Sequence, residues 1–398
     1  MAAATILEQA PQVEIFLLEK NDGLGKKVII SGGGRCNVTT GISDVRTVLT
    51  RYPRGGKFLS SALYGFPPAQ VMAWFEAQGV PLKIEEDLRV FPQSDNGKDI
   101  VGVFERLFHE SPRVHVWLKA NVTKVEKIGE KFSLTVKGKD GPLLVDRLIL
   151  TTGGQAYRQT GSTGDGYAFA QALGHTITPL APSLNAFFTR ETWPAEVSGL
   201  SFEKAKITAL ATKPAEWTGP FLFTHKGVSG PAVFAVSGMV AFEVYDQQHP
   251  LKISIDLFPD QSVEKLITEF MERIAQAPKK NLINALAGFV PKSLLEMLCR
   301  EQSVSLEKHA AEFSKKDLQQ LAQLFKNISL HIIARGAGDE FVTAGGVSLQ
   351  EVNPSTMESK ICPGLFFGGE ILDVDGFTGG FNLQASWATG RLAGTHCL

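Results

Sequence analysis

The sequence has few cysteines, no excess of charge and no long hydrophobic run. Its four cysteines form no C-x-x-C pair and are too few for a disulfide framework, which favours a reducing, cytoplasmic setting. Forty Lys and Arg against 41 Asp and Glu give a net charge of −1, which disfavours a dedicated nucleic-acid binder. The uncharged, mostly apolar stretch 227–242 is too short and too polar to cross a bilayer. The N-terminus lacks the basic segment of a signal peptide, so we expect no membrane partner.

The chain is long enough for a sizeable core and rich in one residue type. Its 398 residues suggest two or three domains at a prior of ~150 residues each. Apolar residues make up 43% and charged residues 20%, as in an ordinary globular protein. Glycine, at 39 residues, exceeds the usual ~7%, and the excess is clustered. These clusters are the strongest indication of function.

Helical and strand-like patterns alternate in the first part of the chain. The expected helices are 1–9, 57–64, 68–78 and 98–109, and the expected strands are 13–18, 114–118, 122–128, 132–136 and 143–150. The run at 13–18 is almost continuously apolar, as in a strand buried on both faces. This alternation with short loops predicts an α/β sheet.

The pattern changes after about residue 182. Short strand-like runs at 185–189, 206–211 and 251–257 indicate an antiparallel β unit. Helical patterns follow at 262–277, 281–288, 291–301 and 317–325, and a last helix is expected at 383–392. We therefore predict a discontinuous α/β domain formed by 1–183 and 353–398. The insert between them, 184–352, carries a helical subdomain at about 260–326.

Glu19 directly follows the first apolar strand. In a dinucleotide-binding βαβ unit, a carboxylate at this position accepts hydrogen bonds from the adenosine ribose, ~20 residues after a G-x-G-x-x-G loop. Counting back from Glu19 leads to just before Met1. We therefore expect that the first strand and the glycine loop of such a domain are missing from this sequence. An acidic residue that merely closes a surface strand is the alternative.

The segment 31–37, SGGGRCN, is the most specific motif. Three successive glycines let the backbone approach a ligand closely and expose N–H groups to anionic or carbonyl oxygens. Arg35 adds a planar cation suited to a pyrophosphate or an electron-rich ring. Lys26 and Lys27 are placed to serve the same anion. A flexible surface turn is the alternative reading.

Two further glycine clusters follow apolar strands. Thr152, Gly153 and Gly154 close the strand at 148–150, where α/β sheets bind ligands at strand carboxyl ends. Near the C-terminus, an apolar strand delivers Glu370 through two glycines. A second glycine pair then opens a helix whose N-terminus has free N–H groups and a positive dipole end. An ordinary strand–turn–helix is the alternative.

Together these segments resemble a bacterial family of FAD-dependent flavoproteins that includes aminoacetone oxidase-like enzymes and a reductase of bile-acid intermediates. The matching segments are GKKVIISGGGRCNVTT, FLFTHKGVSGPAVF, FVTAGGVSLQEVNPSTMESK and PGLFFGGEILDVDGFTGGFNLQASWATGRLAG, and they span essentially the whole chain. The resemblance implies a discontinuous Rossmann-like FAD-binding domain, an inserted β-barrel and a small helical subdomain. The sequence departs from the family at its start, where the glycine loop is missing, and at Phe381, where Tyr is frequent.

By the same resemblance, Glu19 binds adenosine ribose, Val122 holds the adenine through its backbone, and the other glycine-rich segments surround the flavin and its phosphates. The predicted cofactor-binding residues are Glu19, Lys20, Lys26, Ser31, Gly32, Gly33, Gly34, Arg35, Cys36, Asn37, Val122, Thr152, Gly153, Gly154, Gly369, Glu370, Asp373, Gly379, Gly380, Phe381, Asn382 and Leu383.

Few side chains outside these clusters suggest chemistry. FAD would carry the reaction, and NAD(P)H is a possible electron donor. His225 is the best candidate for proton transfer, the alternative being a structural histidine that holds its turn. Cys36 has no resolving cysteine nearby, which favours packing beside the flavin over redox chemistry. The eight histidines are scattered, so we expect no metal site.

The sequence thus predicts an FAD-dependent oxidoreductase that passes two electrons between a small organic substrate and flavin, which O2 reoxidises or NAD(P)H reduces. Two alternatives stay open. One is an impaired flavoprotein that binds FAD poorly because its glycine loop is missing. The other is a tRNA-modifying flavoprotein, which the charge balance disfavours. Neither an oligomeric state nor a choice between NADH, NADPH and oxygen has a signature in the sequence.

Overall fold

The computed structural model describes residues 1–301, 309–336 and 341–398. It divides into two compact units, one formed by residues 1–183 and 340–398 and the other by residues 184–339. The sequence predicts an insert that ends at 352. In the structure, the described residues from 341 onward belong to the first unit. Within the described residues, no helix is both long and apolar enough to cross a membrane.

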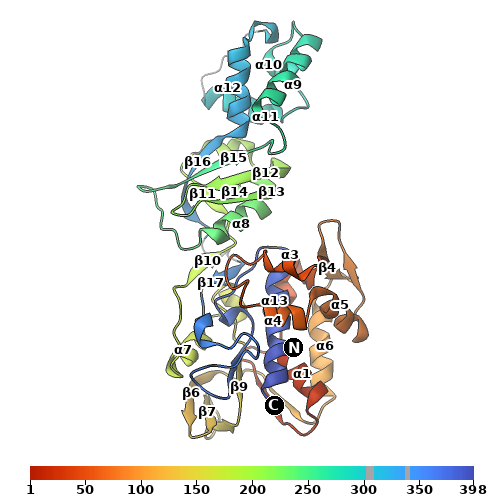
Figure 1. The fold of residues 1–398 in the computed structure, drawn as a ribbon, viewed down its shortest axis with the longest axis vertical. Coiled ribbons are helices and arrows are strands. Elements are labelled where there is room, and N and C mark those ends of the chain that lie inside the picture. The colour runs from red at the N-terminus through yellow and green to blue at the C-terminus, as the bar shows by residue number, and fades with distance from the viewer. Residues whose placement is uncertain (302–308, 337–340) are drawn as a thin grey trace. The chain divides into compact units, whose positions relative to one another are not determined.

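The first unit is an α/β structure with two parallel strand pairs. β1 (Ile15–Leu18) pairs with β5 (Val114–Trp117), and β9 (Leu148–Leu150) pairs with β18 (Leu365–Phe367). Figure 1 shows the long helix α13 (Phe381–His396) beside α1 (Ala2–Gln9) and α4 (Ser60–Gly65), against which it packs. Parallel strands covered by helices are the arrangement of a Rossmann-like α/β fold.

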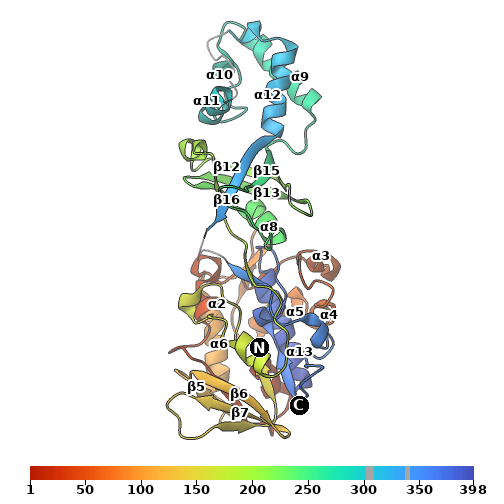
Figure 2. The same cartoon turned by 90° about the vertical axis from the view of Figure 1, so that its left-hand side faces the viewer.

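Smaller sheets and short helices complete this unit. Its antiparallel strands are β2 (Thr39–Thr40), β3 (Leu82–Ile84) and β4 (Arg89–Pro92) in one sheet, β6 (Val122–Ile128), β7 (Lys131–Val136) and β8 (Leu143–Val145) in a second, and β10 (Ala181–Ser183) with β17 (Val342–Ala344) in a third. The helices are α2 (Lys26–Ile30), α3 (Val45–Leu49), α5 (Pro68–Ala77), α6 (Gly97–His109) and α7 (Asp165–Ala172), with 3-10 turns η1 (Ser31–Gly34), η2 (Arg158–Thr160), η5 (Leu349–Glu351) and η6 (Gly369–Ile371). Figure 2 shows the β6–β7 hairpin from the side.

The second unit is a closed six-stranded barrel with helices attached. The strand order is β11 (Phe187–Thr189), β14 (Gly227–Ser229), β13 (Ala215–Thr224), β12 (Ser201–Ala209), β15 (Leu251–Asp256) and β16 (Ile328–Arg335), and β16 pairs again with β11. The helical parts are η3 (Trp193–Val197), α8 (Pro231–Met239), α9 (Val263–Gln276), α10 (Leu282–Ala285), α11 (Lys292–Glu301), η4 (Ala310–Glu312) and α12 (Lys315–Lys326). One continuous apolar core joins the barrel to these helices.

Sequence periodicity predicted many of the elements but missed others, among them α3, α7, β3, β4 and β13, and it misread three further places. The run 143–150 is two strands, β8 and β9, which lie in different sheets. α8 was missed because it is buried almost all round and therefore lacks an amphipathic pattern. β1 is not buried on both faces as expected: Phe16 is 37% exposed, since β1 pairs only with β5 among the described strands.

Candidate functional site

A cavity of about 650 Å³ lies where β1 ends and β6 begins. Lys20 lies in its wall, with its Nζ 2.7 Å from Asp165 Oδ2, and Val122 at the start of β6 also lines it. Glu19 stands beside the cavity, and its Oε1 accepts hydrogen bonds from the backbone and side-chain N–H groups of Asn21, both at 2.8 Å. The structure therefore brings Glu19 and Val122, the two residues predicted for the adenosine end of the cofactor, close to Lys20, another predicted cofactor-binding residue.

The glycine loop Ser31–Gly34 folds as a short turn after α2. Gly32 and Gly33 have φ values of 58° and 73°, a conformation that favours glycine. A Cβ atom on Gly33 or Gly34 would meet nothing within 4 Å, so this backbone is open on one side. Lys26 forms an ion pair with Asp22 at 2.6 Å, and its predicted contact with the cofactor stays a prediction. The loop itself offers open backbone to a ligand.

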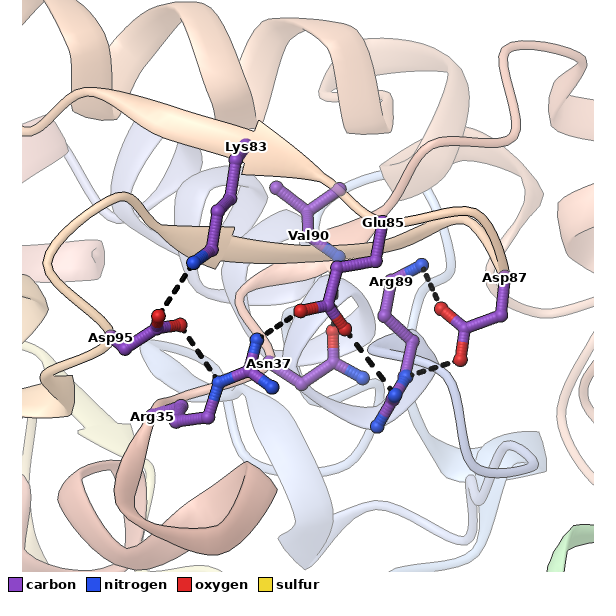
Figure 3. A network of polar contacts seen from close by, with 8 residues as sticks. All are labelled: Arg35, Asn37, Lys83, Glu85, Asp87, Arg89, Val90 and Asp95. Carbon is purple, nitrogen blue, oxygen red and sulfur yellow. Dashed lines mark hydrogen bonds and ion pairs between the residues drawn. The ribbon is translucent and has the colours of Figure 1, made fainter.

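Arg35 is held in a chain of charged side chains on the β3–β4 hairpin (Figure 3). Its guanidinium lies 3.7 Å above the Phe91 ring and forms ion pairs with Glu85 and, at 2.8 Å, with Asp95. Lys83 also binds Asp95, at 2.6 Å, and with Arg35 it lowers the pKa of that carboxyl. In this arrangement, Arg35 fastens the glycine loop to the hairpin. Its predicted contact with the cofactor stays a prediction.

The two residues after Arg35 face the interior. Cys36 is fully buried, and burial raises the pKa of its thiol to about 12, so the reactive thiolate does not form at neutral pH. The amide of Asn37 bridges to the N-terminus of α13 when its oxygen faces the N–H of Gly380, at 2.8 Å. Cys36 thus packs, while Asn37 connects the glycine loop to the C-terminal helix.

Gly154, Thr343 and Glu370 meet in one tight cluster. A Cβ on Gly154 would lie 2.6 Å from Thr343 Oγ1 and 2.9 Å from Glu370 Oε1, so only glycine allows this approach. The N–H of Thr343 donates to Glu370 Oε1 at 2.9 Å, and Lys27 Nζ lies 2.5 Å from Glu370 Oε2. The cluster joins the end of β9 to the turn after β18. Lys27, the neighbour of the predicted Lys26, supplies its cation.

The flanking residues of this cluster are fixed by close packing. A Cβ on Gly166 in α7 would overlap Thr152 Oγ1, so this helix lies directly on the end of β9. Gly153 has φ 72°, and Gly369 has φ 77° with its N–H donating to Thr389 of α13 at 2.9 Å. The segments predicted as separate glycine clusters are therefore neighbours in space.

The N-terminus of α13 is shaped by the second glycine pair. A Cβ on Gly380 would lie 2.2 Å from the carbonyl oxygen of Thr39, which requires glycine at this helix start. Phe381 is buried, and Asn382 holds the preceding loop through two 2.8 Å hydrogen bonds with Gly376. The first-turn N–H groups, including that of Leu383, have no partner within the helix. They form a positive end suited to negative charge.

Among the buried polar atoms of this unit without a hydrogen-bond partner in the described residues are the hydroxyl of Tyr167 and Oδ1 of Asp373. Tyr167 is 4% exposed, and burial together with the charges of Glu370 and Asp373 raises its pKa, so it stays protonated. Burial also raises the pKa of Asp373. Orphaned buried groups are rare and costly, so these atoms point to a bound ligand.

Sequence reasoning missed Tyr167, Thr343 and Asn21. Each stands close to glycines or charged residues, but its own importance comes from neighbours distant in the sequence. The Asp-Gly-Tyr start of α7 is the one local signal for Tyr167, because a glycine in the first turn of a helix suggests close packing.

His225 belongs to the second unit, whereas every predicted cofactor residue belongs to the first. It is exposed at the turn between β13 and β14 and lines a separate cavity there. Its predicted part in proton transfer stays a prediction. In the described residues, no group of three or more His, Cys, Asp or Glu side chains is arranged to hold a metal ion.

Comparison with known proteins gives a family and several relatives. The family profile described as "HI0933-like protein Rossmann domain" matches residues 1–396. The chain is 30% identical to the 3-dehydro-bile acid delta(4,6)-reductase of Clostridium scindens, over 99% of this chain and 95% of that protein. It is also 30% identical to the ribosomal RNA dihydrouridine synthase of Haemophilus influenzae, over 97% of this chain and 92% of that protein.

Structural comparison agrees on the fold. A quinol fumarate reductase of E. coli matches with a TM-score of 0.50 and 14% identity, covering all of this chain and 67% of the other. The sequence-based predictions of a Rossmann-like fold and of the flavin-dependent class are confirmed by these comparisons. However, a ribosomal RNA-modifying relative means that charge balance alone does not exclude an RNA substrate.

Proposed function

From the fact that the chain belongs to the HI0933-like Rossmann-domain family of FAD-dependent oxidoreductases, we propose that it reduces a carbon–carbon double bond conjugated to a carbonyl group. The names of its relatives carry this proposal. A 3-dehydro-bile acid delta(4,6)-reductase acts on double bonds of a steroid that bears a 3-oxo group. Dihydrouridine differs from uridine by a reduced double bond next to a ring carbonyl. The chemistry common to both is the reduction of such a bond.

The residues of the first unit fit FAD. Gly154 and Gly380 occupy positions where a Cβ would collide with Thr343 and Thr39, so the protein segments at two predicted contact points are packed tightly against each other. Gly33 and Gly34 leave backbone open to a ligand. The orphaned Tyr167 hydroxyl and Asp373 Oδ1 suit a molecule rich in hydrogen-bonding groups, such as the ribityl and pyrimidine parts of FAD. This pair of unpartnered buried atoms is the observation that supports a cofactor here.

When bound, FAD supplies the two-electron chemistry, and the protein positions it and tunes its charge. We assign the adenosine end to the cavity at Lys20 and Val122, with Glu19 beside it. The positive N-terminus of α13 would stabilise negative charge on the flavin ring. Tyr167, protonated at neutral pH, would donate a hydrogen bond to the cofactor. Lys27 holds Glu370 in place through its ion pair.

The electron donor is proposed to be NADH or NADPH. The test is anaerobic: the chain is loaded with FAD, and the flavin absorbance near ~450 nm is followed as each nucleotide is added. Bleaching by either nucleotide, followed by return of the colour with a 3-oxo-4,6-diene steroid, supports the proposal. A chain that takes up no FAD, or a reduced flavin that only oxygen reoxidises, contradicts it.

Reduction of uridine in ribosomal RNA is the second candidate, and it rests on the relatives from Haemophilus influenzae and E. coli. The same reduced enzyme is mixed with ribosomal RNA lacking dihydrouridine, and the product is digested and examined by mass spectrometry. A gain of two mass units on a uridine identifies this activity. No gain, together with turnover of the steroid, assigns a small-molecule substrate. The cytoplasmic location stays a prediction from the cysteine content.

A further inference from the structure

A cavity of about 400 Å³ lies in the barrel unit, at the turn that joins β13 to β14. Three segments form its wall: the end of β11 with the residues after it, the turn η3, and the β13–β14 turn. Its lining residues are Phe188, Thr189, Glu191, Thr192, Pro194, Ala195, His225, Lys226 and Gly227. Neither the cofactor residues nor the proposed reaction accounts for this cavity.

The β13–β14 turn is held rigidly at the cavity. Thr224 pairs with Gly227, so His225 and Lys226 are the two residues of a tight hairpin turn. The carbonyl of Lys226 accepts a hydrogen bond from the N–H of Thr189 at 3.0 Å. A Cβ on Gly227 would lie 2.3 Å from the carbonyl oxygen of Phe187, so the turn is pressed against β11. The two basic residues are therefore presented in a fixed place.

The wall of this cavity holds one cation, Lys226, and one carboxylate, Glu191. Lys226 Nζ lies 5.2 Å from the centre of the Phe188 ring and has no carboxylate partner among the described residues. Glu191 is the acidic residue in the wall, but both of its oxygens are taken by His331. Its Oε1 lies 2.6 Å from His331 Nδ1, and its Oε2 accepts the His331 backbone N–H at 2.9 Å. Lys226 is thus the charged group of the wall that forms no ion pair among the described residues, and the exposed His225 lies beside it, whereas Glu191 is engaged by His331.

The rest of the wall is apolar. Phe188 offers a ring face and Pro194 and Ala195 offer aliphatic surface, while the Thr192 side chain is exposed. We propose that this cavity binds an oxyanion carried on a flat apolar body: the anion binds Lys226 and His225, and the body lies against Phe188. A carboxylate on a small molecule and a phosphate on a nucleotide share this chemistry. The proposal concerns binding in the barrel unit and does not depend on the proposed reaction.

The test uses the full chain with 15N,13C-labelled histidine and follows the His225 ring by NMR. The His225 signal is assigned by its loss in His225→Asn. Three probes are titrated: benzoate, its uncharged analogue benzamide, and uridine 5′-monophosphate. The variant Lys226→Gln removes the cation, and Lys213→Gln is the matched control, an exposed lysine of the same unit outside the cavity. Both substitutions are at exposed positions, and equal thermal unfolding of the two variants confirms intact folds.

Saturable shifts of His225 by benzoate or uridine 5′-monophosphate, weakened about tenfold in Lys226→Gln and unchanged in Lys213→Gln, support the site. The stronger of the two probes identifies the anion as a carboxylate or a phosphate. Benzamide should leave His225 unmoved. If benzamide shifts the signal as benzoate does, if Lys226→Gln binds as the unmodified chain does, or if neither anion shifts it, the proposal is wrong.

Discussion

Replacing Tyr167 by Phe should stabilise the FAD-free protein and weaken FAD binding. Tyr167 is 4% exposed, and its hydroxyl has no hydrogen-bond partner among the described residues. A buried polar group without a partner costs about 1–3 kcal/mol. Its removal should therefore raise the stability of the FAD-free protein by about 1 kcal/mol, which raises Tm by about 2–4 °C for a unit of this size.

The weaker binding of FAD to Tyr167→Phe follows from the loss of the same hydroxyl. If it donates a hydrogen bond to the cofactor, Tyr167→Phe removes about 1 kcal/mol from the loaded protein. The two effects have opposite signs, so they add in the binding free energy. Their sum, about 2 kcal/mol, corresponds to roughly 30-fold weaker FAD binding. Quenching of FAD fluorescence gives the Kd, and circular dichroism melts of the FAD-free protein give Tm.

Tyr52→Phe is the matched control. Tyr52 is also buried in the first unit, but its hydroxyl donates to the Phe381 carbonyl at 2.7 Å. Its loss should lower the Tm of the FAD-free protein, because the carbonyl is left unpaired. A Tyr167→Phe protein that melts lower than the unmodified chain would show that the hydroxyl has a partner. An FAD affinity within twofold of the original would refute its contact with the cofactor.

Three further predictions concern stability. Gly380→Ala should lower the free energy of unfolding by about 1–3 kcal/mol because of the left-handed φ alone, and by more because the Cβ would collide with Thr39. Gly79→Ala is the control, since Gly79 has a similar φ but open space around it, so thermal melts of this variant measure the effect of φ alone. Arg54→Met leaves the buried Asp375 carboxylate without its cation and should cost about 3–5 kcal/mol at pH 7.5. Burial raises the pKa of Asp375, so this loss of stability should shrink as the pH falls and the carboxyl is protonated. Thermal melts at pH 5 and pH 7.5 test this. An equal difference in Tm between the Arg54→Met protein and the unmodified chain at both pH values would contradict it. Burial lowers the pKa of His175, so the contribution of this residue to stability should be complete above about pH 6.5 and fall below it as the unfolded chain takes up the proton. In urea unfolding, the free energy of unfolding of His175→Gln should therefore change less with pH than that of the unmodified chain.

Glycine clusters were readable from the sequence because their chemistry is local. A missing Cβ has the same consequence wherever the residue lies, so Gly154 and Gly380 could be singled out without a fold. The structure then shows why each position needs glycine: a neighbouring oxygen stands where the Cβ would be. The fold class followed from strand and helix patterns in the same local way.

Side-chain partners could not be read in this way. Arg35 finds Glu85 and Asp95 some 50 and 60 positions further along the chain, and no local pattern connects them. Lys27 pairs with Glu370 across nearly the whole sequence, while its neighbour Lys26 turns to Asp22. A helix turns by about 100° per residue, so adjacent lysines face different surroundings, and only the tertiary fold decides which one reaches the site.

The parallel pairing of β9 with β18 has a consequence for synthesis on the ribosome. Leu148 of β9 pairs with Leu365 of β18, so the barrel unit is made between the two halves of one strand pair. At about 5–20 residues per second, β9 waits roughly 10–40 s for its partner. During that time, the barrel has all of its own strands and can close first. The first half of the FAD-binding unit meanwhile keeps an open strand edge, which makes this interval the period of greatest exposure to aggregation.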